Sequence, residues 1–151
     1  MVKKEKDIQY YEAVGRRKRA VARVRLHIIN KEKIASVGTL KIKPGEIYIN
    51  GKHIDKFLTL AYERLFINNP LLLTNNEGRF GVSINVSGGG RNGQLEAMVH
   101  GISRALEIVD KTTYRPILKK QGMLKRDPRK KERRKVGTGG KARRVKQSPK
   151  R

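Results

Sequence analysis

The sequence predicts an α+β domain, in which helices cover a sheet, followed by a long extended basic tail. Two segments, 20–28 and 80–86, alternate apolar residues with other residues, which is the period of a strand. A third segment, 93–109, spaces its apolar residues at helical intervals. The last segment, 125–151, has too few large apolar side chains to offset the entropy lost on ordering. We therefore expect a folded body over 1–124 and a tail over 125–151 that is disordered outside its complex.

The first half of the body contains one clear strand and several weaker elements. Short apolar runs predict an extended segment at 40–42 and a strand at 46–50. Turns are expected at Pro44-Gly45 and at Asn50-Gly51, because these pairs favour tight turns. The clear strand, 20–28, turns one apolar side toward the core: Ala20, Ala22, Val24, Leu26 and Ile28.

A helix is expected after the Asn50-Gly51 turn. Asp55 suits the position before its first turn, and Asn68-Asn69-Pro70 suits its end. We expect this helix to pack on the sheet through one face: Phe57, Leu58, Ala61, Tyr62 and Leu65.

The second half of the body predicts a strand, a glycine-rich loop and two helices. The strand 80–86 runs into Ser87-Gly88-Gly89-Gly90, where the glycines end it. A short last helix is expected from Pro116 to Gly122, because proline suits a first turn and glycine a C-terminal cap. The helix 93–109 carries a stripe wide enough to cover a sheet face: Leu95, Met98, Val99, Ile102, Ala105, Leu106 and Val109.

The charge of the chain indicates a polyanionic partner. Lys and Arg number 37 against 13 Asp and Glu, a formal net charge of +24, and half of this charge lies in 125–151. A compact protein with so much positive charge repels itself unless a polyanion neutralises it. No apolar run approaches the roughly 20 residues of a membrane span, and neither an export signal nor an organellar presequence is recognised. With no cysteine in the chain, a cytoplasmic location is expected.

Two segments of the body are candidate phosphate-binding sites. Gly15-Arg16-Arg17-Lys18-Arg19 is followed by Arg23 and Arg25, and no acid occurs from Ala13 to Asn30, which favours contact with a phosphate backbone over a solvated face. The loop 87–94 joins a strand to a helix, where backbone N–H groups bind anions, and Arg91 adds a charge. This loop lacks both the Walker pattern and the dinucleotide fingerprint. It has three interpretations: a site for RNA phosphate, a purely structural turn and, least favoured, a nucleotide site.

Enzyme chemistry finds little support in the sequence. His27, His53 and His100 lie on separate predicted elements, and no paired carboxylates or metal-binding pattern accompany them. We therefore predict no catalytic residue, no metal and no cofactor. The aromatic residues also lack the pattern of a base-stacking surface, so recognition is expected to rest on phosphates and RNA shape.

Several segments occur in an order that resembles one family. Gly15-Arg16-Arg17-Lys18 with Ala20-Val21-Ala22-Arg23-Val24 is similar to its opening strand, and Ile49-Asn50-Gly51 to its second. Ser87 to Gln94 and then His100-Gly101-Ile102-Ser103-Arg104-Ala105-Leu106 are similar to its loop and long helix. The tail contributes Arg126-Asp127-Pro128-Arg129, Glu132-Arg133-Arg134-Lys135 and Lys141-Ala142-Arg143-Arg144. Over nearly its full length the chain resembles the small-subunit ribosomal protein S-nine family (universal name uS-nine), in its bacterial or organellar form.

The resemblance implies a structural constituent of the small ribosomal subunit with a ribosomal protein S5 domain 2-like sandwich, a small mixed sheet with helices on one side. Its partners would be 16S-type rRNA in the subunit head, the P-site tRNA anticodon stem-loop and neighbouring head proteins, without homo-oligomers. The family ends in a Lys-Arg pair that touches tRNA phosphate, and Lys150 and Arg151 match this pair. Before that end the family usually has Gln-Phe-Ser, whereas this chain has Gln147-Ser148-Pro149. The segment 29–46 is longer than the usual loop of the family.

The residues expected to bind rRNA are all cationic. In the body they are Arg16, Arg17, Lys18, Arg19, Arg23, Arg25 and Arg91. In the tail they are Arg126, Arg129, Lys130, Arg133, Arg134, Lys135, Lys141, Arg143 and Arg144. The alternatives are a basic RNA-processing protein such as a ribonuclease P protein subunit, a phosphotransferase that uses the Gly88 loop, and a DNA-compacting protein.

Overall fold

A computed structural model describes residues 3–5, 8–29, 35–37 and 40–133. The strands are β1 (Lys3–Glu5), β2 (Ile8–Arg17), β3 (Ala20–Ile28), β4 (Ala35–Val37), β5 (Leu40–Ile42), β6 (Ile47–Ile49), β7 (Lys52–His53) and β8 (Phe80–Ser87). The helices are α1 (Ile54–Phe57), α2 (Ala61–Leu73), α3 (Arg91–Val109) and α4 (Lys111–Lys120). The predicted α+β class is confirmed.

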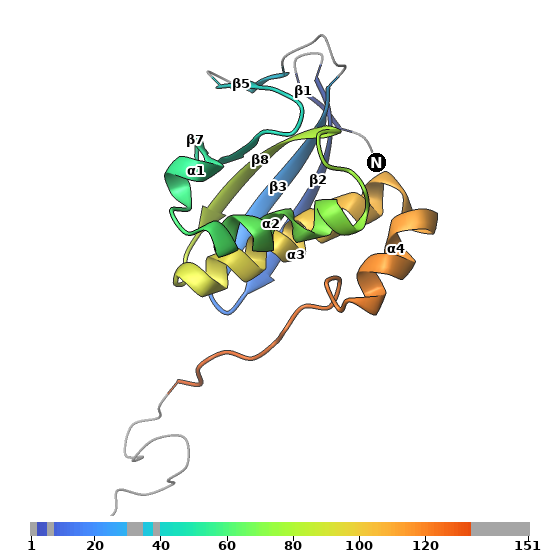
Figure 1. The fold of residues 1–151 in the computed structure, drawn as a ribbon. Helices are drawn as coiled ribbons and strands as arrows, with labels where there is room; N and C mark the ends of the chain where they lie inside the picture. The colour runs from blue at the N-terminus through green and yellow to red at the C-terminus, as the bar shows by residue number, and fades with distance from the viewer. Residues whose placement is uncertain (1–2, 6–7, 30–34, 38–39, 134–151) are drawn as a thin grey trace, which may run out of the picture.

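Six strands form one mixed sheet in the order β1-β2-β3-β8-β6-β7, and β4 pairs with β5 in a separate two-stranded sheet. All neighbours are antiparallel except β6 and β8, which are parallel. The helices α2 and α3 lie on the same face of the six-stranded sheet, with α3 against β2 and β3 (Figure 1). None of the helices in the described part of the chain is long and apolar enough to cross a membrane.

The hydrophobic core lies between the sheet and the helices, and α3 contributes most of its helical residues. The predicted stripe of α3 is confirmed, because six of its seven residues are buried and Val109 packs partly against the core. Four of the five predicted core residues of β3 are also buried, but Ile28, at the end of the strand, is 39% exposed. The neighbouring His27 was expected on the outer face, yet it is buried and bonds to the hydroxyl of Ser83, with Nε2 and Oγ 2.8 Å apart.

The single helix predicted after Asp55 is wrong, since the structure has two helices there. His53, not Asp55, caps α1 by accepting from the backbone N–H of Asp55. The chain becomes extended at Leu58, whose side chain enters the core, and α2 then runs through Pro70. The last turn persists after this proline because Leu71 packs inside and the hydroxyl of Thr74 bonds to the carbonyl of Pro70 at 2.9 Å.

The predicted core face of this region is also wrong in part. Ala61, Tyr62 and Leu65 are exposed, Tyr62 at 61% and Leu65 at 63%, and α2 buries Glu63, Ile67 and Pro70 instead. An apolar strip therefore remains on the outside of α2 and just before it: Leu60, Tyr62, Leu65, Phe66 and Leu72.

The last helix begins earlier than predicted. The side chain of Asp110 accepts hydrogen bonds from the backbone N–H groups of Thr112 and Thr113, so α4 starts at Lys111 and Pro116 lies inside it. Hydrogen bonds from these two threonines lower the pKa of Asp110 to about 2. The predicted end at Gly122 is confirmed, because this glycine has a positive φ of 70° just after α4.

The strand β2 escaped prediction because Ala13 and Gly15 on its core-facing side interrupt any alternating pattern of large apolar side chains. Gly15 and Gly101 let β2 and α3 approach so closely that a Cβ on Gly15 would lie 1.9 Å from the carbonyl oxygen of Ala97. A close backbone contact of this kind leaves no room for the large alternating side chains that mark a strand in sequence.

Candidate nucleic-acid interface

The basic run 16–19 lies at the end of β2 and in the turn to β3. Its side chains point to both faces of the sheet, because successive residues of a strand alternate. Arg16 pairs with Val21 across the two strands and Arg17 with Ala20, so the two arginines point to opposite sides of the sheet. Arg16, Lys18 and Arg19 are exposed, whereas Arg17 is only 7% exposed and turns toward the helices. The run therefore provides three exposed cations and one buried one.

Arg17 is held by three elements of the chain. Its Nε donates to the carboxylate of Glu96 on α3. Its other two nitrogens reach the chain after α4: Nη2 lies 3.0 Å from a carboxylate oxygen of Asp127, and Nη1 donates to the carbonyl of Arg129 at 2.8 Å. The buried guanidinium thus joins the sheet, the long helix and the beginning of the tail.

Asp127 is the central acid of this arrangement. It accepts hydrogen bonds from the backbone N–H and the guanidinium of Arg129, and these bonds, together with the charges of Arg129 and Arg17, lower its pKa to about 2. Asp127 therefore stays ionised at neutral pH, where its charge balances both arginines.

Two arginines continue onto the open face of the sheet. Arg23 is exposed. Arg25 is less accessible, because its Nε lies 2.9 Å from a carboxylate oxygen of Glu12 and its guanidinium lies over the ring of Tyr10. A small hollow beside these arginines is also lined by Tyr48, Gly51, Ser83, Ile84 and Asn85.

The glycine loop lies against the start of β3. Gly88 and Gly89 have φ values of 71° and 65°, and a Cβ on Gly88 would lie 2.6 Å from the carbonyl oxygen of Arg19. Both features require glycine at Gly88, which supports the structural interpretation of this loop. The loop also brings the beginning of α3 beside the basic turn.

Arg91, at the beginning of α3, is paired within the protein. Its guanidinium makes two bonds to the carboxylate of Glu63 on α2, a side chain with no exposed surface. These bonds lower the pKa of Glu63 and raise that of Arg91. Arg91 remains 52% exposed, but part of its hydrogen-bonding capacity is used to hold α2 on α3.

We predict that Arg91→Gln lowers the melting temperature of the protein, because it leaves the buried carboxylate of Glu63 without its cation. Thermal unfolding followed by circular dichroism measures this effect. The double variant Arg91→Gln with Glu63→Gln removes the unpaired charge and should regain part of the loss. A melting temperature unchanged by Arg91→Gln would contradict a structural role for this pair.

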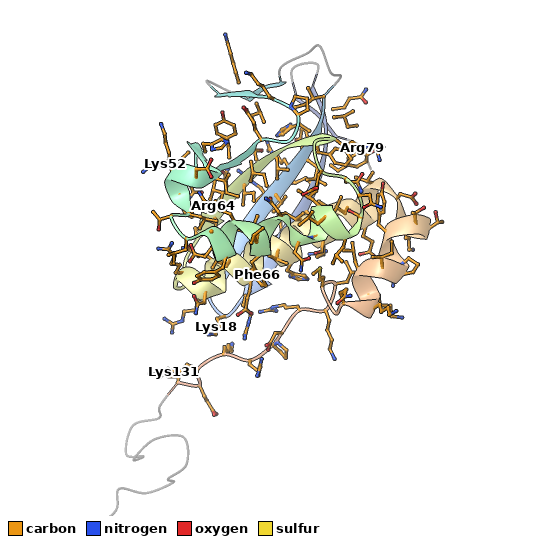
Figure 2. All side chains as sticks on the ribbon, viewed as in Figure 1. Lys18, Lys52, Arg64, Phe66, Arg79 and Lys131 are labelled. Carbon is orange, nitrogen blue, oxygen red and sulfur yellow. The ribbon has the colours of Figure 1, made fainter. Side chains whose placement is uncertain are left out.

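The beginning of the tail passes next to the basic turn and the glycine loop. Together they form an open groove of about 1050 Å³, which we call the tail groove. It is lined by Lys18, Arg19, Gly89, Gly90, Lys130, Lys131, Glu132 and Arg133. Five of these residues are cations and one is an acid, so the potential in the groove attracts anions. Figure 2 shows Lys18 and Lys131 on this side of the molecule, beneath the sheet and on the chain leaving it.

The structure thus brings together part of the predicted set. Lys18, Arg19, Lys130 and Arg133 share the tail groove, whereas Arg23 and Arg25 lie on the open sheet face. Arg126 is exposed between α4 and the groove. The remaining predicted residues lie outside the described residues: Arg134, Lys135, Lys141, Arg143, Arg144, Lys150 and Arg151.

Sequence reasoning missed Lys131 and all the acids that pair with arginine. Lys131 belongs to the same basic run as Lys130, so its position in the run could have indicated it. Glu63 is distant in sequence from Arg91, and both Glu96 and Asp127 are distant from Arg17, so no local pattern identifies these three pairings.

The three histidines lie in structural positions. His27 is buried against Ser83, His53 caps α1, and the Nδ1 of His100 accepts from the backbone N–H of Arg16 at 3.3 Å. Burial and then the charge of Arg104 lower the pKa of His100, so the ring is neutral at pH 7. Within the described ranges, no group of three or more potential metal ligands occurs.

A small α+β body with a cationic groove and a basic chain leaving it has the features of a polyanion-binding protein. Comparison with protein families narrows this class, because the family described as ribosomal protein S9/S16 matches residues 15–151. The chain belongs to the ribosomal protein S9/S16 family. It is therefore a structural ribosomal protein and not an enzyme.

Proposed function

We propose that the protein is a constituent of the small ribosomal subunit, that its body binds 16S-type rRNA in the subunit head, and that its tail reaches the P-site tRNA. Family membership supports the ribosomal part of this proposal. The tail groove carries the RNA-binding part, because five cations from two distant segments line one open hollow. The mixed sheet with helices on one side is consistent with the ribosomal protein S5 domain 2-like fold.

In this proposal the exposed cations of the body make the first phosphate contacts. Arg16, Lys18, Arg19 and Arg23 are exposed and lie on the turn or the open sheet face. Arg25 and Arg91 keep their internal ion pairs and contribute to the positive potential around these contacts. Recognition is then dominated by charge and RNA shape, as expected for contacts to phosphate.

The predicted tail cations continue the same phosphate contacts beyond the tail groove. We propose that the chain divides into a body, 1–124, and a tail, 125–151. The tail extends along rRNA, and only Lys150 and Arg151 contact the tRNA. We place the protein on cytoplasmic ribosomes, where it needs no cofactor.

The apolar strip of α2 supports a contact with a neighbouring head protein. Tyr62, Leu65 and Phe66 are each at least 41% exposed on this helix. A phosphate backbone cannot bury apolar side chains, whereas a protein surface can, and exposed apolar patches commonly mark such contacts. The strip and the tail groove would then serve two different kinds of neighbour.

Deletion of Lys150 and Arg151 tests the division of the tail. We expect the shortened protein to co-sediment with small subunits as the full chain does, because it keeps all the proposed rRNA contacts. We expect reconstituted subunits that carry it to retain P-site tRNA more weakly, since two cations near the tRNA phosphates are removed. Replacement of Lys150 and Arg151 by glutamine is the matched control for chain length. Unchanged tRNA affinity would refute the tRNA contact, and loss of co-sedimentation would refute the division.

A further inference from the structure

We propose that Arg17 orders the beginning of the tail, and that the groove formed in this way binds one phosphodiester strand of RNA. This inference rests on the proposed function, which makes RNA the partner. It assigns a positioning role to a cation that sequence reasoning placed among the direct RNA contacts.

The first step is the burial and bonding of Arg17. Its guanidinium has contacts to Glu96, Asp127 and the carbonyl of Arg129, and its side chain is 8% exposed. A planar guanidinium with all three nitrogens engaged fixes direction as well as distance. We call these four groups the Arg17 clamp. It joins β2 and α3 to a segment without helix or strand, 125–133, which would otherwise have little to order it.

The second step is the position of the clamp relative to the tail groove. Arg17 is next to Lys18 in the basic turn, and Arg129 is next to Lys130 in the tail. Residues on both sides of the clamp therefore line the two walls of the groove, Lys18 and Arg19 on one wall and Lys130 to Arg133 on the other. If the clamp opens, the second wall moves away and the body keeps only the first.

The third step concerns the ligand. The groove is partly open to solvent and is lined by five cations with Glu132 as its one acid. Its glycine side, Gly89 and Gly90, carries no side chain that would obstruct a backbone passing along it. A linear polyanion fits such a groove better than a compact anion, because its successive phosphates can meet cations on both walls. We therefore assign the groove to a phosphodiester strand.

Asp127→Asn distinguishes this inference from simple charge attraction. The substitution removes a negative charge, so attraction alone predicts tighter RNA binding. The clamp predicts weaker binding, because an unanchored tail wall occupies its binding position for only part of the time, and apparent affinity falls by that fraction. If this fraction falls to one tenth, affinity falls about tenfold.

Glu132→Gln is the matched control. It removes the same charge five residues further along, from a residue that lines the groove. We expect this control to leave the clamp intact and to raise affinity by about twofold, the effect of one exposed charge.

Two measurements on the full-length protein test the inference. The first is amide ¹⁵N relaxation of 125–133 in the free protein. The clamp is supported if 125–133 is ordered in the wild type and in Glu132→Gln but moves fast in Asp127→Asn and Arg17→Gln. Equal motion of this segment in all four proteins overturns the clamp. The second is affinity for a transcript of the small-subunit rRNA head domain. If Asp127→Asn binds the transcript as tightly as the wild type or more tightly, the proposal that the ordered groove binds RNA is overturned.

The double variant Arg17→Gln with Asp127→Asn completes the test. If both residues act through one clamp, the double variant loses no more RNA affinity than the Asp127→Asn single variant does. A further loss close to that of Arg17→Gln alone would mean that Arg17 contacts RNA directly, which overturns its positioning role. If wild-type protein fails to bind the transcript, the proposed function fails, and the relaxation experiment still decides whether the clamp exists.

Discussion

The affinity of the protein for small-subunit rRNA should fall by about 10³ to 10⁵-fold when salt is raised from 50 to 200 mM. Each cation that neutralises a phosphate releases a counterion, and roughly 6 to 10 such contacts give a fall of this size. The chain has enough cations for this number, since 14 Lys and Arg lie in 125–151 and more lie on the basic turn. The logarithm of the binding constant should therefore decrease linearly with the logarithm of the salt concentration.

Filter binding or fluorescence anisotropy with an rRNA head-domain transcript measures this slope. A chain ending at residue 133 is an informative control, because it keeps the tail groove and lacks the last 18 residues. Its slope should be shallower by about one for each phosphate that the shorter chain no longer neutralises. A binding constant that hardly changes over this salt range would contradict recognition by phosphates and require contacts to base edges.

The strongest periodic patterns in the sequence predicted the centre of the fold. β3, β8 and α3 were identified because their apolar residues repeat with clear periods of two or about 3.6, and these elements form the core. β2 was missed because its contact with α3 uses Gly15, and the end of α2 was predicted too early because Pro70 is tolerated inside it. In both cases a tertiary contact overrides a local preference, and sequence periodicity contains no information about that contact.

The candidate site shows the same limit. The basic run was visible in the sequence, and its exposed members, Lys18 and Arg19, do line the tail groove. The sequence could not show that Arg17 turns inward, because Glu96 and Asp127 are 79 and 110 residues away from it along the chain. A run of cations without a nearby acid therefore predicts the charge of a surface, but the fold determines which cations stay available to a ligand.

Gly15→Ala should destabilise the protein by about 3 kcal/mol or more, because overpacking of a well-packed contact costs this much when the backbone has to move. A Cβ at this position would lie 1.9 Å from the carbonyl oxygen of Ala97 and 2.4 Å from the backbone nitrogen of Gly101. Neither atom belongs to a flexible side chain, so only separation of β2 from α3 can relieve the overlap. Urea unfolding followed by circular dichroism measures the free energy of unfolding.

Gly90→Ala is the control for this substitution. Gly90 has no atom within 4 Å of its would-be Cβ and precedes α3, so alanine there costs less than about 1 kcal/mol, the loss of a favourable N-terminal cap. The difference between the two variants isolates the close approach of strand and helix from the general effect of replacing glycine. That approach matters for the interface too, because α3 carries Glu96 and β2 carries Arg17. If β2 and α3 separate in Gly15→Ala, the substitution disrupts the Arg17 clamp as well as lowering the free energy of unfolding. An equal loss of unfolding free energy in Gly15→Ala and Gly90→Ala would contradict the close packing of β2 on α3.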